Sequence, residues 1–176
     1  SGTSGTAGAS GTSGRGGAVG TGAVSGQAGS SSCGAVERPT TAIGPDILIL
    51  QDASNSMNDD VTNTMCSGGC GQNSKWTLMT AALEQVVSQT QTEVNWGLKL
   101  FADMSTSSCG VSSTVAAGVA SGNSTAIAAS LTGRTDANGN VTNGSSTPTR
   151  AAENAAVTYM TSLADTNPKY IVLATD

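Results

Sequence analysis

The chain has 176 residues, a formal net charge of −5 and no histidine, and its seven Lys and Arg residues are spread thinly along it. Without a basic stripe that neutralises phosphates, the sequence argues against nucleic-acid binding, and no apolar run approaches the length of a membrane span. The lack of histidine excludes a Ser-His-Asp triad and a Cys-His nucleophile.

The first part of the chain differs in composition from the rest. Residues 1–35 hold 12 of the 23 glycines, and the remaining residues of this segment are mostly Ser, Thr and Ala. Such a segment cannot bury enough apolar surface to offset the entropy lost on ordering. We predict that residues 1–40 are a disordered, flexible linker and that residues 41–176 form a domain. The linker is interpreted either as a tether to a surface or as a polar tail without a role.

The predicted domain begins with the apolar run Asp46-Ile-Leu-Ile-Leu50, which is typical of a strand buried on both faces. The polar residues 51–74 predict a loop. Apolar positions at helical spacing predict a helix over residues 75–90, and alternating apolar residues predict a strand from Val94 to Phe101.

A turn then leads into Val111–Val115, for which we predict a third strand that folds back as a hairpin. Residues 124–131 carry a short helical pattern. Past Pro148 a further helix is predicted, with one apolar side made of Ala152, Ala156, Tyr159, Met160 and Leu163. The run Tyr170–Leu173 predicts another buried strand.

This order of elements predicts an α/β fold with an open, mostly parallel, Rossmann-like sheet and flanking crossover helices. In such sheets, ligands bind beyond the carboxyl ends of the strands. Two of the predicted strands run into an aspartate there, Asp52 after the first and Asp176 after the last. If these strands are parallel neighbours, the two carboxylates converge.

The residues after the first strand indicate a metal-binding loop. Asp52-Ala-Ser54-Asn-Ser56 places three oxygen-bearing side chains at alternate positions. Carboxylate and hydroxyl oxygens are the ligands that hard cations such as Mg²⁺ prefer. The alternative is that Asp52 and the two serines cap a turn or the next helix, a common role of these residue types.

The stretch from Asp46 to Met57, DILILQDASNSM, resembles the first strand and metal-ion-dependent adhesion site of von Willebrand factor A (VWA) domains. In that family a Thr from a later loop, often within Gly-x-Thr-Pro-Thr, and an Asp that ends the fourth strand complete the site. Gly144-Ser-Ser-Thr147-Pro-Thr149 and the segment Ile171–Asp176 stand in the same order here. The resemblance covers residues 46–176.

The resemblance implies a site for Mg²⁺, or for Mn²⁺ or Ca²⁺, made of Asp52, Ser54, Ser56, Thr147 and Asp176. Thr149 replaces Thr147 if the loop register is shifted, because this loop has one residue more between Gly and Thr than the family pattern. The family continues past the second Asp with a Gly and further strands and helices. The resemblance therefore implies the N-terminal portion of such a domain, with an incomplete sheet.

The four cysteines favour an oxidising, extracytoplasmic location: the cell surface, the periplasm or the medium. The preferred pairing joins Cys109 to Cys66 or Cys70 and the other of these two to Cys33, because the turns that carry Cys66, Cys70 and Cys109 should meet at one end of the sheet. The second scheme joins Cys66 to Cys70 and Cys33 to Cys109. A four-cysteine zinc site is the remaining alternative, although the paired Cys-x-x-Cys spacing is absent.

The predicted site suits binding better than catalysis. Two carboxylates and three hydroxyls leave a dication near neutrality with an exchangeable position, which an acidic side chain of a protein partner can fill. We therefore expect a cation-dependent, adhesion-type protein-binding module, tethered to a surface through an upstream segment, and not an enzyme. One alternative is a metal-dependent phosphoester hydrolase on a Rossmann-like fold, although Ser54 stands where those enzymes place a second Asp. Another is a structural module with a vestigial metal site.

Overall fold

The computed structural model describes residues 44–102 and 111–176, so the predicted linker over residues 1–40 lies outside it. Within these ranges the chain has an α/β fold, with three α-helices and a four-stranded mixed sheet in the order β3-β2-β1-β4. This architecture is consistent with the predicted Rossmann-like fold. The strands are β1 (Asp46–Asp52), β2 (Asn95–Phe101), β3 (Ala117–Ala120) and β4 (Lys169–Ala174).

Strand β1 lies in the middle of the sheet and pairs in parallel with both β2 and β4. Its residues Leu48, Ile49 and Leu50 are fully buried, which confirms the predicted strand with two covered faces. Full burial of each of these side chains contributes about 1.5–3 kcal/mol. The parallel pairing brings the carboxyl ends of β1 and β4 to the same edge of the sheet, as the sequence predicted.

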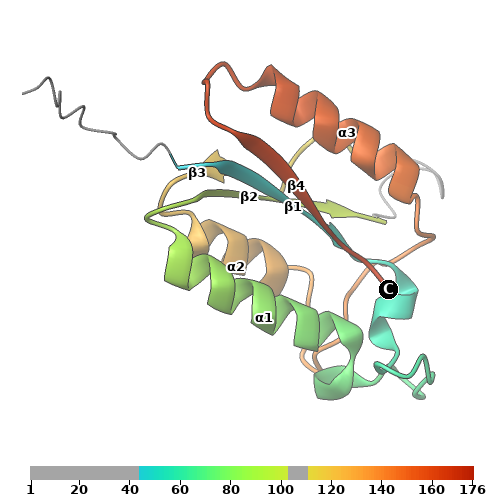
Figure 1. Cartoon of the computed structure of the whole chain (residues 1–176). Coiled ribbons are helices and arrows are strands. Elements are labelled where there is room, and N and C mark those ends of the chain that lie inside the picture. Colours follow the sequence, from blue (N-terminus) through green and yellow to red (C-terminus); the bar gives the residue numbers. More distant parts are fainter. Residues whose placement is uncertain (1–43, 103–110) are drawn as a thin grey trace, which may run out of the picture. The chain divides into compact units, whose positions relative to one another are not determined.

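The helices cover both faces of the sheet. Figure 1 shows α1 (Lys75–Thr90) and α2 (Ser124–Thr132) on one face and α3 (Thr149–Ser162) on the other. Two short 3₁₀ helices, η1 (Asn55–Asn58) and η2 (Gly71–Asn73), lie between β1 and α1. In the part of the chain that the structure describes, no helix is long and apolar enough to cross a membrane.

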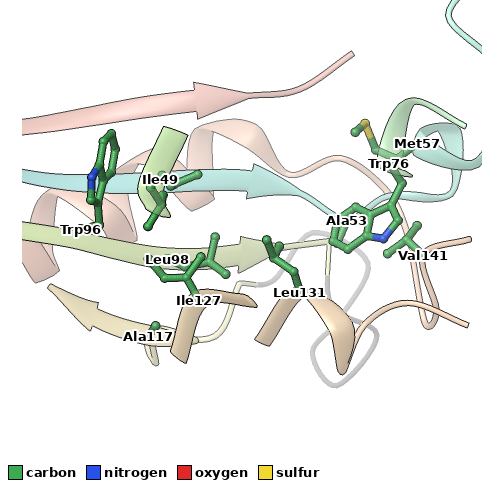
Figure 2. Close-up of a cluster of buried hydrophobic side chains, with 11 residues drawn as sticks. Ile49, Ala53, Met57, Trp76, Trp96, Leu98, Ala117, Ile127, Leu131 and Val141 are labelled. Atoms are coloured by element: carbon green, nitrogen blue, oxygen red, sulfur yellow. The ribbon is translucent and has the colours of Figure 1, made fainter. Parts of the chain in front are cut away.

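Two apolar clusters hold these layers together. The first packs the sheet against α1 and α2 and extends from Trp96 to Trp76, Met57 and Val141, close to the carboxyl edge of the sheet (Figure 2). The second packs β1 and β2 against the side of α3 that the sequence predicted to be apolar. Because successive strand residues point to opposite faces, β1 supplies Ile49 to the first cluster and Leu48 and Leu50 to the second.

The predicted strand at Val111–Val115 is wrong. The antiparallel hairpin with β2 exists, but its second strand is β3, several residues later. The buried Lys99 side chain of β2 donates hydrogen bonds to the backbone carbonyls of Ser112 (2.5 Å) and Thr114 (2.9 Å). These carbonyls therefore bind a side chain and not a neighbouring strand.

The last strand is present where the sequence predicted it, but it is not buried. Tyr170 is 55% exposed and Val172 is 43% exposed. The reason is the position of β4, which among the described residues pairs only with β1 and lies at the edge of the sheet. An apolar run therefore identified the strand but not its place in the sheet.

Candidate metal site at the carboxyl edge of the sheet

The first carboxylate of the site belongs to Asp52, the last residue of β1, which is fully buried. The backbone N–H of Ser54 donates to its Oδ1 (2.7 Å), and the hydroxyl of Thr175 donates to its Oδ2 (2.7 Å). In the described part of the chain, no ion pair joins Asp52 to Lys or Arg. The carboxylate is thus hydrogen-bonded but not compensated by a cationic side chain.

The two serines connect Asp52 to the second carboxylate. The turn into η1 brings Ser54 Oγ and Ser56 Oγ to 3.0 Å, and Ser56 Oγ donates to Asp176 Oδ1 (3.1 Å). Ser54 is buried, whereas Ser56 is half-buried. Asp52, Ser54, Ser56 and Asp176 are therefore brought together, although 120 residues separate Ser56 from Asp176 in the sequence.

A lysine that no sequence motif indicated, Lys75, also contacts this site. Lys75 Nζ lies 2.6 Å from Asp176 Oδ2, and the two side chains are only 12% and 16% exposed. Burial raises the pKa of the Asp176 carboxyl, but the hydrogen bonds from Lys75 and Ser56 outweigh it and hold the pKa below its ordinary value. The sequence held one signal for this ion pair: Lys75 stands in the first turn of the predicted helix, where a positive charge opposes the helix dipole and needs a compensating partner.

Thr147, the fifth predicted residue, is exposed in the loop before α3. Among the described residues, no hydrogen bond joins it to the other four, and its carbonyl accepts from the backbone N–H of Thr149 (2.9 Å). The same loop reaches the site through Gly144, where an added Cβ would lie 2.8 Å from the Ala53 carbonyl oxygen. A metal-binding role of Thr147, or of Thr149 in its place, stays a prediction.

The loop between β1 and α1 is closed by a disulfide between Cys66 and Cys70. The preferred pairing of either residue with Cys109 is therefore wrong, and the bridge is the one in the second scheme. The cause is local: a turn with a hydrogen bond from Gly69 N to Cys66 O (2.9 Å) brings the two Cα atoms within 5.0 Å. Because their sulfurs are bonded to each other, they are not thiolate ligands of a zinc ion. Cys33 and Cys109 lie outside the described residues.

The donor set fits a small, hard cation. The side-chain polar atoms of the four predicted residues that come together are all oxygens, and the Ser54–Ser56 and Ser56–Asp176 oxygens are 3.0 and 3.1 Å apart. Neighbouring ligands of an octahedral ion with bonds of about 2.0–2.1 Å lie about 2.9–3.0 Å from each other. A buried carboxylate such as Asp52 is costly without a compensating charge, which a cation would supply.

The fold and this edge define the class of the protein: an α/β domain with an open sheet and a cluster of oxygen-bearing side chains where its parallel strands β1 and β4 end. In comparisons with known proteins, no family model, no curated protein and no solved structure matched the chain. The resemblance to VWA domains therefore depends on the three separated sequence motifs.

Proposed function

We propose that the chain is a VWA-like binding module, which holds a divalent cation through Asp52, Ser54, Ser56 and Asp176 and uses it to bind a protein partner. The observation that carries this proposal is the convergence of these four residues through hydrogen bonds. The Ser54 backbone N–H donates to the Asp52 carboxylate, and the side-chain oxygens of Ser54, Ser56 and Asp176 follow one another at 3.0 and 3.1 Å, the spacing of neighbouring ligands. The sequence motif and the three-dimensional convergence are separate observations, and both favour the same chemistry.

The burial of the ligands favours binding over catalysis. Asp52 and Ser54 are buried, whereas Ser56 is half-buried and the Asp176 side chain is partly exposed. A cation here would be held from the protein side and open on the other. An acidic side chain of a partner is the natural ligand for that open side, because hard cations prefer carboxylate oxygens.

The proposal includes an extracytoplasmic location, at a cell surface, in the periplasm or in the medium. It is supported by the Cys66–Cys70 disulfide, since such bonds persist mainly in oxidising compartments. The bridge lies in the loop that follows the Asp52 motif, so reduction would loosen one border of the site. The Gly/Ser/Thr-rich residues 1–40 would then serve as the tether to the surface.

Calorimetric titration with Mg²⁺ and Mn²⁺ tests the first step of this function. We expect wild type to bind one ion, and Asp52→Asn to weaken the binding by about a hundredfold or more, because it removes the buried charge. Asp46→Asn is the matched control, since Asp46 is an equally buried aspartate at the other end of β1. Equal affinities in wild type and Asp52→Asn would contradict the proposal.

Three further measurements separate the remaining alternatives. Thr147→Val and Thr149→Val, titrated in the same way, show which threonine completes the cation site; we expect Thr147→Val to bind more weakly. Cation-dependent turnover of a generic phosphoester such as p-nitrophenyl phosphate would favour the hydrolase. If the chain binds a cation but binds acidic protein ligands equally well with and without it, the structural module is favoured.

A further inference from the structure

Asp176 divides its two carboxylate oxygens between different partners. Oδ1 accepts from the Ser56 hydroxyl at 3.1 Å and therefore faces the proposed cation ligands. Oδ2 lies 2.6 Å from the ammonium group of Lys75. The stem of Lys75 borders an apolar hollow of about 280 Å³ that Met57, Leu78 and Met79 also line. Lys75 is thus an internal cation fixed on the carboxylate that the proposed site needs.

The position of Lys75 in its helix makes this contact informative. Lys75 is the first residue of α1, and no acidic residue stands in the first turn. A positive charge there is repelled by the N-terminal end of the helix dipole. The ion pair with Asp176 offsets that repulsion, so the two residues depend on each other across 101 positions of sequence.

We propose that Lys75 is a built-in competitor of the divalent cation: its ammonium group compensates Asp176 when the ion is absent and weakens the binding of the ion when it is present. This inference rests on the proposed function. The charges of Asp52, Asp176 and Lys75 sum to −1, and a bound dication therefore leaves a net charge of +1. That remaining charge favours an anionic ligand, which deepens the proposal of an acidic partner residue.

The test uses variants that remove the positive charge of Lys75. Lys75→Gln keeps a hydrogen-bond donor for Asp176 but removes the positive charge, and Lys75→Met removes both. Lys169→Gln is the matched control, because it removes one positive charge at the far end of β4, where Lys169 pairs with Asp165. We expect calorimetry to show about tenfold tighter Mn²⁺ binding by Lys75→Gln and no change in Lys169→Gln.

Thermal unfolding gives a second measurement. In a chelator, Lys75→Gln should melt at a lower temperature than wild type, because two neighbouring carboxylates then lack a cation. Added Mn²⁺ should raise the Tm of this variant more than that of wild type. Lys75→Met should show the same pattern of Tm values, which guards against a result peculiar to one substitution.

The outcomes distinguish the two proposals. If wild type binds Mn²⁺ and the Lys75 variants bind it equally or more weakly, Lys75 only positions Asp176 and the competitor role is wrong. If neither wild type nor the Lys75 variants bind, the proposed function and this inference both fail. Tighter binding by both Lys75 variants, with Lys169→Gln unchanged, supports the competitor role.

Discussion

Strand β1 carries a buried aspartate at each end, and the two ends of the sheet surround these carboxylates differently. At the amino end, Asp46 Oδ1 accepts from the side-chain amides of Asn95 (2.8 Å) and Asn167 (3.0 Å). Lys169 Nζ lies 3.6 Å from its Oδ2. This carboxylate therefore joins the beginnings of β1, β2 and β4 and is compensated by a lysine of the same domain.

At the carboxyl end, Asp52 is just as buried, but within residues 44–102 and 111–176 it accepts only from neutral donors, the Ser54 N–H and the Thr175 hydroxyl. The ammonium group at this end, that of Lys75, pairs with Asp176 instead. A buried aspartate on a central strand can thus be compensated inside the domain, as Asp46 is, or be held by neutral donors, as Asp52 is. We propose that the second arrangement serves a ligand from outside.

The largest effect on stability is expected at the amino end. Asp46→Ala removes a buried carboxylate and leaves the side-chain amides of Asn95 and Asn167 without their charged acceptor, so it should lower the free energy of unfolding by about 3–5 kcal/mol. Urea denaturation in a chelator measures this loss. Asp52→Asn, measured in the same way, should change stability by less than about 1 kcal/mol, because it removes an uncompensated charge. An equal loss in both variants would remove the contrast between the two ends.

An intermediate effect is expected from the hydroxyl that holds Asp52. Thr175→Val keeps the shape of the side chain but leaves Asp52 Oδ2 without its donor, which should cost about 1–3 kcal/mol in a chelator. A bound cation would satisfy that oxygen, so the loss should be smaller with saturating Mn²⁺. Urea titrations with and without Mn²⁺ test this, and a loss that Mn²⁺ does not reduce would place Asp52 Oδ2 outside the cation site.

The order of strands and helices along the chain followed from the sequence because it depends on periodicity, and the meeting of the two aspartates followed on the condition that their strands are parallel neighbours. One apolar run ends in Asp52 and another ends near Asp176. Once these strands are parallel, the two carboxylates lie at the same edge of the sheet. The Lys75–Asp176 ion pair and the Cys66–Cys70 bridge depend on how a polar loop folds, which apolar periodicity does not encode. The position of β3 depends on a side chain, Lys99, that binds the backbone of the preceding segment.

The smallest effect is expected from pH at the amino end. The hydrogen bond from Lys169 holds the pKa of Asp165 below its ordinary value of 3.8. A carboxyl with a lowered pKa in the folded state stabilises the fold above its unfolded-state pKa and loses this contribution as the pH falls through the folded value. Asp165→Asn should therefore melt slightly below wild type near neutral pH, and the difference in Tm should shrink and disappear as the pH falls through the lowered folded-state pKa of Asp165. A difference that persists in acid would show that charge is not its cause.

The central claim is that the carboxyl edge of the sheet, and not its amino edge, holds a cation. Anomalous diffraction from a crystal soaked in Mn²⁺ tests it most directly. The account predicts one peak about 2.1 Å from Ser54 Oγ and Ser56 Oγ, beside the carboxylates of Asp52 and Asp176. A saturated crystal with no peak at these residues, or with its peak beside Asp46, would contradict it.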